Sequence, residues 1–261
     1  MGRLALNSGL RAYAHTPTVE TAPGFVNEYS IALDGSNDWV GSEEIPETEL
    51  EGQVSMSVWV KVGQQDRSEA VVGIGNDNYT AGGFEIKFAC WKSNQSTGKW
   101  WLWQGNGHRS TQNIYLDTST AEPTVGWHHI VFSDTSTDSS AGVCKVYIDG
   151  TEVHEFTSIQ WSAPSYTDNH AIVSMGRYMS YFDGKVDEFA IWYRALSASD
   201  VTDIYNSGAP TDLSALSSGG PDHWWRMGDL ASGSTLPDQG SGTGLDMTLN
   251  NGASVDADVP T

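Results

Sequence analysis

The densest group of residues that could do binding chemistry is the aromatic run Lys99–Trp103, which reads KWWLW. Side chains alternate between the two faces of an extended strand, so Trp101 and Trp103 share one face. Tryptophan rings on a surface stack on sugar rings or fill protein interfaces. His108 and Arg109 follow closely and add polar groups. We therefore predict a carbohydrate-binding or partner-binding surface at these four residues. Packing of all the aromatic side chains inside the fold is the alternative.

A second candidate site is the acidic turn Asp34–Asp38, which reads DGSND. Calcium prefers several oxygen ligands from carboxylates and loop carbonyls, and Asp34 and Asp38 supply carboxylates on one turn. Asp and Asn are also common in turns that bind nothing. The sequence contains no Ser/His/Asp elbow motif and no His/Cys cluster with metal-binding spacing. Calcium is therefore the one cofactor that we consider, and we predict no catalytic residue.

Composition excludes several partners. The chain has 261 residues and a formal net charge of −20, so phosphate groups of nucleic acid or of an anionic membrane would be repelled. No stretch approaches the ~20 apolar residues of a membrane span. The first residues do not resemble an export signal, because Asn7-Ser8-Gly9 interrupts the apolar run. For this reason we expect Cys90 and Cys144, both in predicted strands, to be buried thiols rather than a disulfide.

The elements that must position these residues are mostly short strands. Val54–Val62 alternates apolar and polar residues, and Asp149-Gly150 is typical of a two-residue hairpin turn. Many such strands at short spacing predict an antiparallel β-sandwich, with a jelly roll as its natural form. The other predicted strands are Tyr29–Leu33, Ala70–Ile74, Gly83–Trp91, Trp100–Gln104, Ile114–Leu116, Trp127–Phe132, Cys144–Ile148, Thr151–Phe156, Ile172–Met175 and Val186–Tyr193.

One short helix is predicted in the stretch Tyr181–Gly208. A turn at Phe182-Asp183-Gly184 precedes a strand with period-two apolar residues, and Ser197 to Asp200 then fits a capping box. Asn206-Ser207-Gly208 should end the helix after about two turns.

Four stretches in this order resemble the laminin-G-like, concanavalin A-like lectin/glucanase family: Tyr29–Val40, Val54–Val62, Gly126–Val153 and Tyr181–Gly208. The resemblance implies a concanavalin A-like jelly roll over residues 28–208, after an extended arm at 1–27. The tail, 209–261, is similar to the block that usually precedes the family's opening strand. A circularly permuted edge of the same sandwich and a truncated second repeat are the two explanations. We favour the permuted edge, because the tail is too short for another sandwich.

The resemblance also bears on the acidic residues. In these folds the opening turn lies beside the Asp-Glu strand, which implies that Asp187 converges with Asp34 and Asp38 on one calcium ion. Laminarinase-type relatives carry Glu-x-Asp-x-x-Glu on that strand, with two catalytic glutamates. This chain has Lys185 and Ala190 at the two glutamate positions. The glycoside hydrolase interpretation therefore fails at the residues that matter.

From these observations we expect a non-catalytic structural or interaction protein of a larger assembly. Phage structural proteins often resemble this family, which favours a capsid decoration or tail-associated protein of a virion, assembled in the host cytoplasm. A carbohydrate-binding module or adhesin at the cell surface or outside the cell is the alternative, because this fold hosts many functions.

The N-terminal arm is the expected assembly element. It has no helix or strand period, so by itself it would bury too little surface to become ordered. We expect it to lie across a neighbouring subunit in a homo-oligomer, with a trimer as the best single estimate, and to contact capsid or tail proteins. The residues expected to make these contacts are Arg3, Leu4, Leu6, Leu10, Arg11 and Tyr13.

Overall fold

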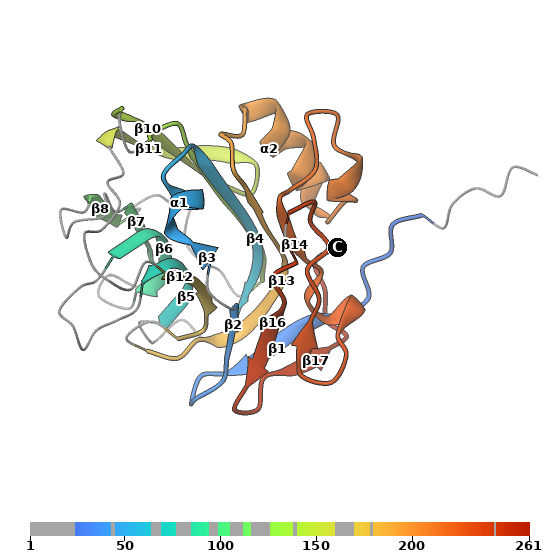
Figure 1. Cartoon of the computed structure of the whole chain (residues 1–261). Coiled ribbons are helices and arrows are strands. Elements are labelled where there is room, and N and C mark those ends of the chain that lie inside the picture. Colours follow the sequence, from blue (N-terminus) through green and yellow to red (C-terminus); the bar gives the residue numbers. More distant parts are fainter. Residues whose placement is uncertain are drawn as a thin grey trace, which may run out of the picture.

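The protein folds into two antiparallel β-sheets that face each other (Figure 1). The structure is a computed structural model that describes residues 24–42, 45–63, 69–76, 85–93, 99–104, 112–115, 126–137, 140–159, 170–177, 180–242 and 244–261. The predicted all-β sandwich is confirmed. No helix in these described ranges is long and apolar enough to cross a membrane.

The first sheet has the strand order β11-β10-β9-β4-β13-β1-β17, and β14 pairs with β13 beside β1. Every pairing is antiparallel. Its strands are β1 (Ser30–Asp34), β4 (Val54–Val62), β9 (Trp127–Asp134), β10 (Gly142–Ile148), β11 (Thr151–Ile159), β13 (Asp183–Trp192), β14 (His223–Trp225) and β17 (Ser254–Asp256).

The second sheet has the order β15-β16-β2-β12-β5-β6-β7-β8, and β3 pairs with β12. A single helical turn, α1 (Glu47–Leu50), connects β3 to β4. The strands are β2 (Trp39–Ser42), β3 (Ile45–Pro46), β5 (Glu69–Asn76), β6 (Glu85–Ser93), β7 (Lys99–Gln104), β8 (Gln112–Tyr115), β12 (His170–Met175), β15 (Thr235–Leu236) and β16 (Met247–Asn250).

The main core lies between the two sheets. The alternating apolar residues of β4 face it, and Val54, Val58 and Val62 are fully buried there. A second apolar cluster covers the outer face of the first sheet, where Val201 and Ile204 of a short helix pack near Trp192. Both faces of β4 are therefore covered, which explains why its serines are buried although alternation alone would expose them.

The short helix near the C-terminal side is α2 (Ala198–Tyr205). The predicted capping box is confirmed: Ser197 Oγ accepts from the Asp200 N–H at 3.2 Å, and Asp200 Oδ2 accepts from the Ser197 N–H at 2.8 Å. Asn206 ends the helix in the left-handed conformation, as the Asn-Ser-Gly sequence predicts.

The hairpin between β10 and β11 turns at Asp149-Gly150, where both residues have positive φ. This is the backbone form that Asp-Gly favours. A Cβ at Gly150 would lie 2.6 Å from the ring of Tyr205, so packing against α2 requires glycine there as well. Cys90 and Cys144 are buried thiols, and burial raises the pKa of Cys90 well above its usual range.

The C-terminal tail contributes strands to both sheets. β16 pairs with β2, β17 pairs with β1, and β14 pairs with β13. Two short helical turns, η2 (Asn206–Gly208) and η3 (Leu213–Ala215), lie between α2 and β14, and a third, η4 (Met227–Leu230), follows β14. Lys185 donates to Asp256 at 2.6 Å and to Asp258 at 3.0 Å, so charged contacts hold the end of the chain across the first sheet.

Candidate functional site

A row of aromatic positions crosses three neighbouring strands of the second sheet. Trp101 on β7 lies opposite Trp91 on β6 and opposite Tyr115 on β8. Directly opposed residues of an antiparallel pair lie on the same face of a sheet. The register therefore assigns all three positions to one face, in a row that spans about 10 Å across the strands. We call Trp91, Trp101 and Tyr115 the aromatic row.

The aromatic row belongs to the face of the sheet that is turned away from the core. Trp100, the neighbour of Trp101, is fully buried and packs in the core with Cys90. Because successive strand residues alternate between faces, position 101 falls on the opposite face. Trp103 shares that face, with Ala89 and Asn113 opposite it. The register thus assigns four aromatic positions and one asparagine position to this face of the sheet.

The predicted binding residues are partly assembled by this arrangement. Trp101 and Trp103 share a face, whereas His108 and Arg109 lie outside the described residues. Trp91 and Tyr115 were not among the predicted site residues. Both fell within predicted strands, and their aromatic character was the available signal. Only the pairing register shows that they stand beside Trp101.

The acidic turn brings Asp34 and Asp38 together, but not as free ligands. Asp34 Oδ1 accepts from the Ser36 N–H at 2.8 Å, and Asp38 Oδ2 accepts from the Asp34 N–H at 3.2 Å. The Ser36 N–H in particular lowers the pKa of Asp34, whereas burial raises that of Asp38. The carboxylates thus stabilise the turn itself.

Asp187 is not part of this turn. Asp34 lies opposite Asp183, so Asp187 is four residues further along β13, or about 13 Å away. The three predicted calcium ligands therefore do not converge, because the pairing register separates them. No group of three or more His, Cys, Asp or Glu residues within the described ranges could hold a metal ion. Calcium binding stays a prediction for the Asp34–Asp38 turn alone.

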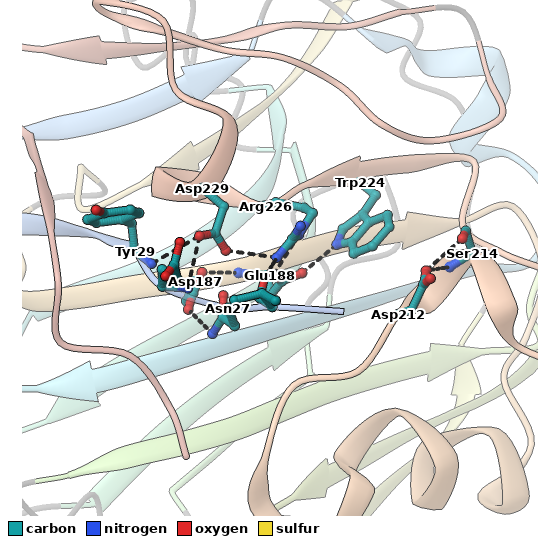
Figure 2. A network of polar contacts seen from close by, with 11 residues as sticks. Asn27, Tyr29, Asp187, Glu188, Asp212, Ser214, Trp224, Arg226 and Asp229 are labelled. Carbon is teal, nitrogen blue, oxygen red and sulfur yellow. Dashed lines mark hydrogen bonds and ion pairs between the residues drawn. The ribbon is translucent and has the colours of Figure 1, made fainter. Parts of the chain in front are cut away.

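Asp187 instead belongs to a buried polar network with Glu188 (Figure 2). Asp187 lies opposite Trp59 of β4 and Ala190 lies opposite Ser57, so β13 has one extra residue at this point. Glu188 has a φ of 44°, as expected for a β-bulge. The bulge brings two consecutive carboxylates into one network, where regular alternation would have separated them.

Side chains from β14 and η4 complete the network. Glu188 Oε2 accepts from Trp224 Nε1 at 2.6 Å, and Glu188 Oε1 accepts from Arg226 Nε at 3.2 Å. Arg226 also donates to Asp229 Oδ2 at 2.8 Å. Asp187 Oδ2 accepts from Asn27 Nδ2 at 2.9 Å. Glu188 and Asp229 therefore share one guanidinium, and Asp187 adds a third carboxylate to the network.

This imbalance changes how the carboxylates titrate. Burial raises the pKa of Glu188 to about 7, although the charge of Arg226 and the hydrogen bond from Trp224 lower it. Burial, and next the charge of Glu188, raise the pKa of Asp187 well above its usual range. A buried carboxylate with too few partners is more stable when protonated.

The network fastens the N-terminal segment Phe25–Tyr29 to the domain. Asp229 Oδ1 accepts from the backbone N–H groups of Glu28 at 2.9 Å and Tyr29 at 3.2 Å. Arg226 donates to the carbonyl of Val26, and its guanidinium lies 4.4 Å from the centroid of the Phe25 ring. Asp187 and Glu188 are consequently buried, at 0% and 3% exposure, and no substrate can reach them.

Positions 185 and 190, where laminarinase-type proteins carry the two catalytic glutamates, have other roles in this protein. Lys185 forms the ion pairs with Asp256 and Asp258, and Ala190 is fully buried opposite Ser57. Neither side chain is a carboxylate. The residues expected to form the N-terminal arm, Arg3 to Tyr13, lie outside the described residues.

Comparison with known proteins gives one family and a set of similar folds. A profile of the concanavalin A-like lectin/glucanases superfamily matches residues 34–202, which is more than half of the chain. A search of curated proteins found no match.

Two solved structures illustrate the shared fold. A native heptameric SAP-like pentraxin from Limulus polyphemus is 12% identical with a TM-score of 0.56, over 88% of this chain and 95% of the pentraxin. A putative carbohydrate binding protein from Bacteroides ovatus is 14% identical with a TM-score of 0.61, over 89% of this chain and 61% of that protein. The chain thus spans less than two thirds of the Bacteroides ovatus protein. At these identities the likeness concerns the fold alone.

Proposed function

Because the chain belongs to the concanavalin A-like lectin/glucanase superfamily, we propose that it is a non-catalytic domain that binds carbohydrate. The aromatic row carries this proposal. Trp91, Trp101 and Tyr115 share a face turned away from the core, and flat aromatic rings stack on the apolar face of a pyranose. Asn113 on the same face adds an amide that can both donate to and accept from sugar hydroxyls.

We propose no catalysis because of the residues on β13. The glutamate pair of a glycosidase needs two accessible carboxylates at a fixed separation. Here Lys185 and Ala190 occupy those positions, and Asp187 and Glu188 between them are buried under the N-terminal segment. The fold of the Bacteroides ovatus carbohydrate binding protein, which this chain shares, is compatible with a binding role.

The proposal is tested by glycan binding. The full chain is first screened on an array of immobilised oligosaccharides, and hits are titrated by isothermal calorimetry with the same oligosaccharide free in solution. The Trp101→Ala variant should weaken binding by about tenfold or more, because loss of a central aromatic anchor costs about 1–2 kcal/mol or more. The Trp103→Ala variant should cost less, because Trp103 is opposed by Ala89 rather than by a second aromatic residue.

Tyr181→Ala is the matched control, because Tyr181 is an exposed aromatic residue on another part of the chain. It should bind like the unmodified protein. The proposal fails if the full chain binds no oligosaccharide or soluble polysaccharide, or if Trp101→Ala binds as tightly as the control.

A structural role in a viral particle, and a location on a virion or at a cell surface, stay predictions. The comparisons give no support to a phage capsid or tail role.

A further inference from the structure

Exposed apolar side chains gather at one edge of the sandwich. Within the described residues, the exposed large hydrophobic side chains are Val26, Tyr29, Tyr181, Leu230 and Val255. Isolated exposed apolar residues are ordinary, but a group of them on adjoining segments indicates an interaction surface. Four of these five belong to the N-terminal segment, η4 and β17. We call Val26, Tyr29, Leu230 and Val255 the edge patch.

The three segments of the edge patch are in direct contact. Val255 lies opposite Ile31, two residues after Tyr29, in the pairing of β17 with β1. Asp229, the neighbour of Leu230, accepts from the Tyr29 N–H. A Cβ at Gly228 would lie 2.5 Å from Cβ of Tyr29, so η4 packs closely against the N-terminal segment. The exposed fractions of the four residues range from 42% to 54%.

The edge patch is held in place before any partner arrives. The network of Asp187, Glu188, Arg226 and Asp229 fastens the N-terminal segment, and Phe25 stacks on Trp224 with 6.3 Å between ring centroids. An ordered surface loses little conformational entropy on binding, which favours affinity. Buried charged networks are also costly to form, so their use to fix a terminal segment calls for a reason.

β17 gives this edge a second property of an interface. Among the described strands it is the end strand of the first sheet and pairs with β1 alone. End strands carry backbone groups that are not paired within the sheet, and these groups pair readily with an extended segment. An extended apolar peptide would therefore find both backbone partners and the side chains of the edge patch here.

The chain itself has such a segment. Residues 1–23 contain Leu4, Leu6, Leu10 and Tyr13, and they have two arginines against a single glutamate in a chain of net charge −20. The described N-terminal residues leave the sandwich beside η4 and lead away from it (Figure 1). No atom lies within 4 Å of a Cβ built at Gly24. Twenty-three extended residues span about 75 Å, which is enough to reach a second molecule.

We propose that the edge patch of one molecule binds residues 1–23 of a second copy of this chain. The edge patch would contact the leucines of the arm. The net negative charge of the chain would attract the two arginines of the arm. This contact is independent of the aromatic row, which lies on the other sheet. Binding of the arm to its own molecule is the other outcome of the test, and it would leave the full chain monomeric.

The test measures molecular mass in solution by sedimentation velocity. The full chain should form oligomers at micromolar concentration, whereas a variant without residues 1–23 and a Leu230→Asp variant should both be monomers. Tyr181→Asp is the matched control, because Tyr181 is the exposed large apolar residue outside the edge patch among the described residues, and the change is of the same kind; this variant should assemble normally. Thermal melting of each variant reports on folding, and Leu230→Ser replaces Leu230→Asp if the charge disturbs η4.

A mixing experiment distinguishes exchange of arms from other contacts. The Leu230→Asp chain keeps its arm, and the truncated chain keeps its edge patch, so their mixture should form a one-to-one heterodimer although each is monomeric alone. A monomeric full chain would overturn the proposal, and so would a truncated chain that assembles as well as the full chain. Assembly of the full chain without heterodimer formation in the mixture would overturn it too, since the arm and the patch would then not bind each other.

Discussion

The substitution Arg226→Met is the sharpest test of the buried polar network. It removes the guanidinium that Glu188 and Asp229 share and keeps an apolar stem of similar length. The side chain of Arg226 is 16% exposed, that of Glu188 is 3% exposed and that of Asp229 is 7% exposed, so water can replace the lost contacts only poorly.

The magnitude follows from the burial and from the titration of Glu188. Removing one partner of a buried ion pair costs about 3–5 kcal/mol, because the remaining charge stays buried without compensation. The pKa of Glu188 is raised from 4.5 to about 7 in the folded state. Its contribution to stability is therefore full below pH 4.5 and is lost as the pH rises through about 7. Without Arg226 this pKa should rise further, at a cost of about 1.4 kcal/mol per unit at alkaline pH.

The assay is urea denaturation followed by tryptophan fluorescence, at about pH 5 and at about pH 8. We expect Arg226→Met to lower the free energy of unfolding by about 3–5 kcal/mol at the higher pH and by clearly less at the lower pH, where Glu188 is protonated. Lys145→Met is the matched control. Its ion pair with Glu152 has a distance of 2.9 Å, but both side chains are 40% exposed. It should cost clearly less than Arg226→Met, because water screens an exposed ion pair.

Two results would refute this reasoning. A loss below about 1 kcal/mol at the higher pH would mean that the network adds no more than a surface pair does. An equal loss at both pH values would mean that Glu188 does not change its protonation state between the two.

Three further predictions concern other parts of the fold. Burial lowers the pKa of His129 from 6.5 to about 3, so the contribution of the neutral imidazole to stability is full above pH 6.5 and is lost as the pH falls towards 3. Below pH 6.5 the free energy of unfolding should therefore drop less steeply in His129→Gln than in the unmodified protein. Ser197→Ala should cost about 1 kcal/mol by removing the helix cap, whereas Ser199→Ala, at an exposed position in α2, should cost clearly less; equal losses would argue against the cap. A calcium ion bound at the Asp34–Asp38 turn of the folded state would stabilise it, so EDTA should lower the melting temperature and added calcium should restore it; an unchanged melting temperature would remove the calcium prediction.

Much of the fold could be predicted because it depends on residues close together in the chain. The capping box needs only Ser197 and Asp200, three positions apart. The Asp149-Gly150 turn needs two adjacent residues that tolerate positive φ. The alternation in Val54–Val62 needs only the period of a strand. Each prediction was confirmed in the structure, because each rests on local backbone geometry.

The candidate sites depended on distances that the sequence does not specify. Alternation placed Trp101 and Trp103 on one face, but the neighbours Trp91 and Tyr115 follow from the register of β6, β7 and β8. The calcium prediction went wrong at Asp187 for the same reason, since the register of β1 against β13 separates it from Asp34.

The sequence by itself determined most of the longer strands, the Asp-Gly turn, the capped helix and the family, since alternation, turn residues and caps are properties of short segments. The tertiary structure alone decided which faces meet. It inserts one extra residue in β13, so that Asp187 and Glu188 enter one network with Arg226, although period-two alternation would place them on opposite faces. The physical reason is that strand pairing is set by the combined burial of many distant side chains. A bulge or a register is therefore a property of the whole sandwich and not of any single stretch.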